Sequence, residues 1–251
     1  MSKAKITLLL TGAIAPNTWD MLKVTDSEVR RRQYIEAITY YLENTNYDLI
    51  FVENSGNDIS NYFKQYKKRT EFLTYESEPT VPDRGKGYKE MEILQYAYEN
   101  SQILLKSGHI IKITGRLKII NLQKLIRNNI LKLTNQDFIA TCIYKEGKMD
   151  ARCFAFSLSF LDEFLKYKEK VNLKYSFEKA LWKSVISFVK NNRATYRQFS
   201  ENLRVSGVNG AFGVAYDRSV IIEFAKYLRY QFLRKSKVKL LEKQINSQKH
   251  Y

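Results

Sequence analysis

The sequence predicts an α/β fold with a mostly helical C-terminal part. Residues 6–10 and 48–52 are almost entirely apolar, which is typical of strands buried on both faces of a parallel sheet. The segment between them has apolar residues at helical spacing, so a strand–helix–strand unit opens the chain. After residue 160 the apolar spacing is mainly helical. We therefore expect one domain over residues 1–251, with the sheet core in residues 5–160 and a helical part in residues 160–251.

The first strand is expected at Lys5–Thr11, followed by a loop that begins at Gly12. A secretory signal is the alternative, because lysines precede the apolar run and Ala13-Ile14-Ala15 resembles a cleavage site. We favour the strand, since Thr11 and Gly12 interrupt the apolar run early. No segment reaches the roughly 18–20 apolar residues that a membrane-spanning helix needs.

The remaining elements follow from turn signals and apolar spacing. Asp26 or Ser27 can cap the first helix. Further strands are expected at residues 71–75, 109–113, 138–144 and 152–157. Further helices are expected at residues 88–105, 119–132, 175–189 and 219–245. Turns or loops are expected at residues 79–87, 145–149 and 207–213.

The overall charge is strongly positive, with 42 Lys and Arg against 26 Asp and Glu and a net charge of +16. Such a charge favours polyanionic partners, which include nucleic acid, nucleotide phosphates and anionic membrane surfaces. The two cysteines, Cys142 and Cys153, lie in apolar segments outside any CxxC pair. We read them as reduced core thiols of a cytoplasmic protein rather than as a disulfide.

Polar or small residues follow the predicted strands at several points. These loops begin at Thr11-Gly12, Glu53-Asn54 and Thr114-Gly115-Arg116. Ligands of open α/β sheets bind at the carboxyl ends of the strands, so we expect these residues to form a site together. The residue types suit a ligand that carries phosphate.

Gly85-Lys86-Gly87 precedes a predicted helix, where glycine lets backbone N–H groups approach a phosphate and Lys86 adds positive charge. The segment is neither a Walker A motif nor a dinucleotide fingerprint. Such a short motif also occurs in ordinary turns.

Arg116 is informative because of its position after a central strand. Arginine binds phosphate oxygens through two parallel N–H donors. The alternative is a structural ion pair between Arg116 and a carboxylate.

A catalytic base would have to be a carboxylate, and the candidates are Glu53, Asp150 and Glu178. Any of them can instead be a surface acid or an arginine partner. With two histidines and no Cys/His spacing, no zinc site is expected.

The last predicted helix combines an apolar stripe with a run of cations that begins at Arg229. It can lie on anionic lipid, bind nucleic acid phosphates, or simply present a solvated face. Membrane contact is favoured over nucleic acid, because no recognised nucleic-acid-binding module is visible.

Five blocks, in order, resemble a group of bacterial glycosyltransferases encoded in capsule and lipooligosaccharide loci. The blocks are residues 6–12, 51–56, 85–93, 111–121 and 150–154. The resemblance covers about residues 5–160 and implies a GT-A-like fold with a nucleotide-binding mixed sheet. It also implies transfer of a sugar from a nucleotide-sugar donor to a growing surface glycan such as a capsule, lipooligosaccharide or O-antigen.

The resemblance further implies roles for individual residues. In such a reaction Asp150 would be the base, with Glu178 as the alternative, and Arg116 and Lys86 would stabilise the departing nucleoside diphosphate by their charge. The residues implied in donor binding are Thr11, Gly12, Glu53, Asn54, Lys86, Gly87, Tyr88, Thr114, Gly115 and Arg152. Thr114-Gly115-Arg116 stands where related enzymes carry an acidic metal-binding DxD motif. We therefore expect no metal and no other cofactor.

The implied partners are a nucleotide sugar, a glycan or glycolipid acceptor and an anionic membrane surface, without nucleic acid. The implied location is the cytoplasm, including the inner face of the cytoplasmic membrane. Two alternatives remain: a basic nucleic-acid-binding protein without enzymatic activity, and another nucleotide-sugar enzyme such as an epimerase or nucleotidyltransferase. The missing GxGxxG argues against an NAD-type epimerase, and the lack of clustered acids argues against a two-metal nucleotidyltransferase.

Overall fold

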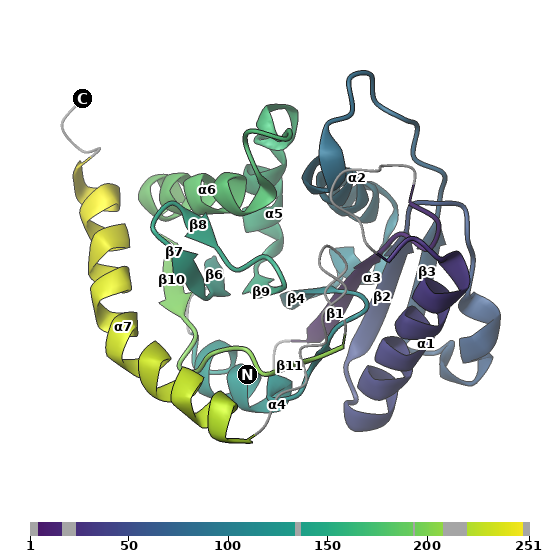
Figure 1. The fold of residues 1–251 in the computed structure, drawn as a ribbon, viewed down its shortest axis with the longest axis horizontal. Helices are drawn as coiled ribbons and strands as arrows, with labels where there is room; N and C mark the ends of the chain where they lie inside the picture. Colours follow the sequence, from purple (N-terminus) through teal and green to yellow (C-terminus); the bar gives the residue numbers. More distant parts are fainter. Residues whose placement is uncertain (1–4, 17–23, 134–136, 193, 208–219, 248–251) are drawn as a thin grey trace.

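The computed structural model describes residues 5–16, 24–133, 137–192, 194–207 and 220–247. A seven-stranded mixed sheet in the order β10-β6-β9-β4-β1-β2-β3 forms its centre. Helices cover both faces of the sheet, and the long helix α7 runs along the β10 side of the molecule (Figure 1). The predicted α/β architecture is confirmed.

Four consecutive strands form the parallel half of the sheet. They are β1 (Ile6–Gly12), β2 (Asp48–Glu53), β3 (Thr70–Thr74) and β4 (His109–Thr114). β1 pairs with β2 on one side and with β4 on the other, and all seven of its residues are buried. This burial on both faces explains its unbroken apolar sequence. Because the four strands are parallel, their carboxyl ends share one edge of the sheet.

The other half of the sheet contains a reversal of chain direction. β9 (Cys153–Phe156) is antiparallel to both β4 and β6 (Phe138–Thr141). Ile113 pairs with Cys153, so β9 begins beside the carboxyl end of β4. The residues that precede β9 therefore arrive at the same edge where β1 and β4 end.

The predicted strand over residues 138–144 is in fact two strands. β7 (Ile143–Lys145) follows β6 after one residue and forms a hairpin with β8 (Lys148–Met149). The predicted turn at residues 145–149 is thus the tip of a short hairpin, with Gly147 at φ +74°. A left-handed φ of this kind suits glycine, which has no Cβ.

The region after residue 160 is less purely helical than expected. It contains α5 (Leu158–Leu165), α6 (Phe177–Asn192) and α7 (Val220–Ser247), but also the strands β10 (Thr195–Gln198) and β11 (Val205–Ser206). β10 pairs with β6 at the sheet edge, and β11 pairs with β5 (Lys118–Ile119). These strands are too short and too polar to give a strand pattern. Within the predicted loop at residues 207–213, only Gly207 is among the described residues.

Several helices differ in detail from the prediction. α1 (Ser27–Asn44) begins as expected, with Asp26 Oδ1 accepting hydrogen bonds from Glu28 N and Val29 N. The predicted helix 88–105 is two helices, α2 (Gly85–Asn100) and α3 (Gln102–Leu105). Ser101 separates them because its backbone is extended and its side chain caps α3. In the predicted helix 119–132, α4 (Leu122–Leu125) continues as a π-helical turn at Ile126–Ile130.

The sheet divides the hydrophobic core into two clusters. One contains Leu9 and Val52 with α2, α5 and α6, and the other contains Leu8 and Leu10 with α1 and α4. Cys142 and Cys153 are buried free thiols, as predicted. Burial raises the pKa of Cys142 to about 12 and raises the pKa of Cys153 as well.

α7 is attached to the core through a few contacts and is exposed elsewhere. Leu241 is buried in the core. Tyr230 donates a 2.6 Å hydrogen bond to the backbone oxygen of Phe199. The predicted apolar stripe on this helix is largely exposed, since Phe224, Leu228 and Phe232 are 61%, 52% and 84% exposed. None of the described helices is both long and apolar enough to cross a bilayer.

Candidate functional site

Glycines at the ends of β1 and β4 leave no room for a side chain at either position. A Cβ on Gly115 would lie 2.6 Å from the backbone oxygen of Thr11, and a Cβ on Gly12 would lie 2.7 Å from the Phe51 ring. Tyr34 of α1 packs against both glycines. Its hydroxyl accepts a 2.9 Å hydrogen bond from Ala13 N. The structure therefore brings the predicted residues at 11–12 and 114–116 together, as the parallel order required.

A buried ion pair lies directly behind these strand ends. The Lys112 side chain is 1% exposed, and its Nζ is 2.5 Å from Glu90 Oε1 of α2. The same oxygen of Glu90 accepts a 2.5 Å hydrogen bond from Thr11 Oγ1. Lys112 Nζ also donates to the backbone oxygen of Ala151 at 3.0 Å and to Thr114 Oγ1 at 3.3 Å. This ion pair connects β1, β4, α2 and the segment before β9.

Arg116 is buried beside a second arginine. Arg116 is 9% exposed, and its Nη1 donates a 3.0 Å hydrogen bond to Gln33 Oε1. Its Nε has no hydrogen-bond partner among the residues that the structure describes. Arg30 bonds to the backbone oxygens of Ala13 and Val24 rather than to a carboxylate.

The charge of Arg116 acts on Arg30. Burial lowers the pKa of Arg30, and the positive charge of Arg116 lowers it further, against the opposing effects of Tyr34 and Glu53. Neither arginine forms an ion pair with a described carboxylate, so the structural-pair alternative for Arg116 finds no support in this part of the chain. Two neighbouring guanidinium groups with spare donors suit an anionic ligand.

Glu53 shapes the adjoining loops. It is fully buried, and its carboxylate accepts hydrogen bonds from Ile14 N at 2.8 Å, Ser55 N at 3.0 Å and Asn57 N at 2.8 Å. The Ser55 hydroxyl is a fourth donor. A carboxylate offers about four lone-pair positions, so these contacts fill Glu53. Next to it, buried Asn54 donates its backbone N–H to Gly12 O at 3.1 Å.

The start of α2 lies beside the strand ends. Lys86 is exposed in its first turn, and Glu90 one turn later makes the contact with Thr11. A Cβ on Gly87 would lie 3.3 Å from Phe177 at the start of α6. Tyr88 is buried under the Arg84 guanidinium, which lies 3.8 Å from the centre of its ring. Of the residues predicted in this segment, Lys86, Gly87 and Tyr88, it is Lys86 that presents a charge to solvent.

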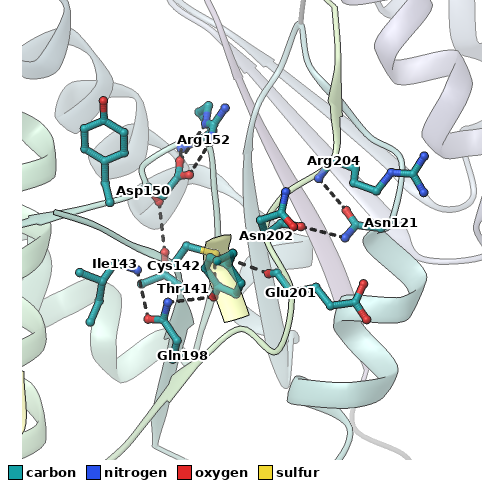
Figure 2. Close-up of polar contacts among 12 residues, drawn as sticks. Asn121, Thr141, Cys142, Ile143, Asp150, Arg152, Gln198, Glu201, Asn202 and Arg204 are labelled. Carbon is teal, nitrogen blue, oxygen red and sulfur yellow. Dashed lines mark hydrogen bonds and ion pairs between the residues drawn. The ribbon is translucent and has the colours of Figure 1, made fainter. Parts of the chain in front are cut away.

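Asp150 and Arg152 form a two-point pair in front of β9. Asp150 Oδ1 is 2.9 Å from Arg152 Nε, and Oδ2 is 2.6 Å from Arg152 Nη2. Figure 2 shows the Arg152 side chain turned toward Asp150. The backbone of Asp150 is fixed by hydrogen bonds with Cys142 O and Thr141 Oγ1. The Arg152 backbone oxygen accepts a 3.0 Å bond from Thr114 N, which joins this pair to the end of β4.

Hydrogen bonds orient the Asp150 carboxylate but do not occupy all of its acceptor positions. Arg152 N adds a third donor at 3.1 Å to Oδ1, so both lone pairs of that oxygen are used and one position remains on Oδ2. A substrate hydroxyl can donate there. The other candidate base, Glu178, lies half-buried in the first turn of α6, next to Phe177.

The sequence analysis did not identify Lys112, Glu90 or Arg30 as site residues. Lys112 gave a signal, because a lysine inside an otherwise apolar strand must find a partner when it is buried. Nothing in a single sequence pairs it with Glu90. No group of three or more His, Cys, Asp or Glu in the described segments is placed to hold a metal ion.

A scan against protein-family models and a search of curated proteins found no match. Among solved structures, an inositol-1-phosphate CTP transferase from T. maritima is 8% identical, with a TM-score of 0.50 over 91% of this chain and 97% of that chain. A protein from Desulfovibrio desulfuricans G20 described as a nucleotide-diphospho-sugar transferase is 11% identical, with a TM-score of 0.46 over 78% and 80% of the two chains.

A third similar structure is a glycosyltransferase involved in the glycosylation of the major capsid of PBCV-1. It is 14% identical, with a TM-score of 0.44 over 78% of this chain and 80% of that chain. At such identities a match shows the fold alone, and the match to the T. maritima enzyme extends over nearly the whole of both chains. The likeness to the T. maritima enzyme supports the predicted α/β fold, which here consists of a seven-stranded mixed sheet with flanking helices and a C-terminal helix.

Proposed function

We propose that this protein transfers a sugar from a nucleotide-sugar donor to a glycan or glycolipid acceptor. One observation carries the proposal: the buried Arg116 guanidinium at the end of β4, which lies beside Arg30 and has an Nε without a described partner. Buried donors without partners are costly, so a ligand that satisfies them gains binding energy. A diphosphate at the carboxyl edge of the sheet has the charge and the oxygens to do this.

The chemistry follows from the placement of charge. The leaving group is a nucleoside diphosphate, and Arg116 would stabilise its growing negative charge, with Lys86 as a second cation. Because cations already occupy the place where related enzymes carry metal-binding acids, we expect turnover without a divalent metal. Direct attack by the activated hydroxyl would invert the anomeric centre.

Asp150 is the proposed base. Its free lone-pair position on Oδ2 can accept the acceptor's proton, while Arg152 holds the carboxylate in one orientation. Glu178 is the alternative. Replacing Asp150 with Asn keeps the shape but removes the basic oxygen, so we expect sugar transfer to fall while nucleotide binding remains.

The acceptor side supports a membrane-facing location. The exposed face of α7 carries Phe224, Leu228 and Phe232 together with exposed lysines such as Lys235 and Lys239. A helix of this kind can place its aromatic groups in the lipid interface and its cations on anionic headgroups. We therefore propose contact with the inner face of the cytoplasmic membrane, where surface glycans of the capsule, lipooligosaccharide or O-antigen class are assembled.

The membrane contact is tested with Phe232→Asp and co-sedimentation on phosphatidylcholine–phosphatidylglycerol vesicles. We expect Phe232→Asp to reduce vesicle binding, because the residue is 84% exposed on the proposed contact face. Tyr62→Asp is the matched control, since Tyr62 is 56% exposed on a different element. Unchanged binding of Phe232→Asp would place the lipid contact elsewhere.

Nucleotidyl transfer is a second candidate, favoured by the fold shared with the T. maritima CTP transferase. The two reactions differ in their products. A glycosyltransferase releases a nucleoside diphosphate or monophosphate from the sugar nucleotide, whereas a nucleotidyltransferase releases pyrophosphate from a nucleoside triphosphate. Product analysis after incubation with each class of donor separates them.

Thermal stabilisation by nucleotides and nucleotide sugars, in EDTA and in Mg²⁺ or Mn²⁺, tests donor binding directly. We expect a shift that persists in EDTA and disappears in Arg116→Ala. Arg32→Ala is the matched control, because Arg32 is exposed on α1 near Arg30. A shift that Arg116→Ala leaves intact would remove Arg116 from the donor site. A shift with oligonucleotides alone would favour the nucleic-acid-binding alternative.

A further inference from the structure

A cavity of about 490 Å³ lies between α7 and the sheet. Its walls come from the β7–β8 hairpin, from residues 150–152, from residues 202–203 and from the inward face of α7. Figure 2 shows the sheet-side residues of this wall, with Asp150, Arg152 and Cys142 close together. The Arg152 backbone is hydrogen-bonded to Thr114 N, so the cavity adjoins the end of β4.

The lining of this cavity is strongly cationic. Five of its side chains are basic and one is acidic: Lys145, Arg152, Lys226, Arg229 and Lys237, with Asp150. The charge of Asp150 is already balanced by Arg152. Three cations of α7 line this cavity, namely Lys226, Arg229 and Lys237, and Arg229 is also exposed to solvent at its mouth. Lys235 and Lys239 are exposed on the same helix but do not line the cavity.

The cations of the cavity are engaged to different degrees. Lys226 is paired with Glu223 at 2.6 Å, and Lys237 donates to the backbone oxygens of Ile143 and Tyr144 at 3.1 and 2.8 Å. Arg229 has no ion pair or hydrogen bond within the described segments. Its positive charge also lowers the pKa of Lys237, after the larger effect of burial. Close cations of this kind favour an anion between them.

The cavity is also held in shape. Tyr230 in its floor donates to Phe199 O and accepts a 2.8 Å bond from Gln198 Nε2, and Gln198 Oε1 accepts from Ile143 N at 3.1 Å. Asn121 fixes the opposite wall by bonding to the backbone of Asn202 and Arg204 at 3.0 Å (Figure 2). A preformed cavity of this size loses little entropy when it binds a small ligand.

We propose that this cavity binds a phosphate-bearing group, with Arg229 as its principal cation. Because the cavity adjoins Asp150 and the end of β4, this group is the phosphate or diphosphate ester of the acceptor. The anion site itself does not depend on the proposed glycosyl transfer, but its assignment to the acceptor does.

The test uses inorganic pyrophosphate and isothermal titration calorimetry at low salt. Pyrophosphate is expected at the strand-end arginines as well, so the measurement is made in the Arg116→Ala protein, where the remaining binding reports the cavity. In that background we expect Arg229→Gln to weaken binding at least about tenfold, the loss expected for one charge-assisted hydrogen bond. Lys239→Gln removes the same charge from the outer face of α7 and should change binding by less than about twofold.

Two results would overturn the cavity site. One is equal weakening by Arg229→Gln and Lys239→Gln, which would indicate a general effect of net charge. The other is the absence of any pyrophosphate binding in Arg116→Ala. Melting curves of each variant without ligand show whether it is folded, and Arg229→Lys should retain part of the binding.

A second arm separates the source of the phosphate and the two proposals. If the cavity binds lipid headgroups, phosphatidylglycerol vesicles will compete with pyrophosphate. If it binds a soluble phosphate ester, glycerol phosphate will compete with pyrophosphate. Nucleotide-sugar stabilisation that survives Arg229→Gln shows that the donor site is separate. If nucleotide sugars do not raise the melting temperature of the wild-type protein, while pyrophosphate binding still depends on Arg229, the proposed function is refuted. The anion site in the cavity is then still supported.

Discussion

The buried pair between Lys112 and Glu90 leads to an asymmetric prediction for its two single mutants. Lys112 is 1% exposed, whereas the Glu90 side chain is 25% exposed. Removing one partner of a buried pair costs about 3–5 kcal/mol, because the other charge is left without compensation. After Glu90→Ala, Lys112 retains Ala151 O and Thr114 Oγ1 as neutral acceptors. We therefore expect a loss at the low end of that range, about 3 kcal/mol.

Replacing Lys112 instead of Glu90 should reduce the free energy of unfolding by less. In Lys112→Met the remaining charge is on Glu90, which water reaches and which still accepts from Thr11. We expect a loss of about 1–2 kcal/mol. The methionine side chain also packs against the rings of Phe154 and Phe177, which lie 5.8 and 5.6 Å from Lys112 Nζ. In the double variant Glu90→Leu/Lys112→Met no buried charge remains, so its stability should lie close to that of the wild type.

Urea unfolding measures these differences, with fluorescence and circular dichroism followed in parallel. Coincident transitions license a single free energy of unfolding for each variant. Trp182 is 1% exposed and should report loss of the core. Glu36→Ala is the control, because its pair with Lys118 is at the surface and should contribute about 0–1 kcal/mol. A loss below about 1 kcal/mol for Glu90→Ala, or a double variant less stable than both single ones, would refute the reasoning.

Three further predictions concern packing and titration. Gly115→Ala should lower the free energy of unfolding by about 1–3 kcal/mol and weaken nucleotide binding, because the new Cβ would lie 2.6 Å from Thr11 O. Gly147→Ala is the control: its Cβ meets no atom within 4 Å, so it should cost only the strain of a φ of +74°. Phe160→Ala should cost about 3–5 kcal/mol, since Phe160 is fully buried, whereas Phe232→Ala at 84% exposure should change stability by less than about 0.5 kcal/mol. The free energy of unfolding should fall as pH rises above 9.0, because unfolded thiols ionise there while Cys142 stays protonated up to about 12. Cys142→Ser should reduce that pH dependence, and a thiol reagent at pH 8 should modify the native protein far more slowly than the unfolded one.

The parallel half of the fold could be predicted because its signals are local. The apolar runs of β1 and β2, the Asp26 cap of α1 and the strand at residues 109–113 each depend on a few consecutive residues. β10 could not be predicted, because its four residues are stabilised by pairing with β6 rather than by their own pattern. The break at Ser101 was missed for a related reason, since an amphipathic pattern continues across the two helices.

The candidate site was predictable to the same extent. Parallel strand ends share an edge, so a common site for Gly12 and Gly115 could be expected from the sequence. Their direct closeness depends on the pairing of β1 with β4, which the sequence did not indicate. The partners of charged residues did not follow, because each lies far away in sequence. Glu90 and Lys112 are such a pair. Arg30 and Arg116, which lie on α1 and after β4, are another.

The reversed direction of β9 separates the two sides of the candidate site in the chain. Residues 150–152 reach the carboxyl edge of the parallel strands from the β7–β8 hairpin. Thr11 and Thr114 instead lie at the ends of the parallel strands β1 and β4. The hairpin therefore can lengthen or change sequence without shifting the register of β1, β2 and β4. Under the proposed function, we expect changes of acceptor preference to arise mainly through this hairpin and α7, without changes in the strands that would hold the donor.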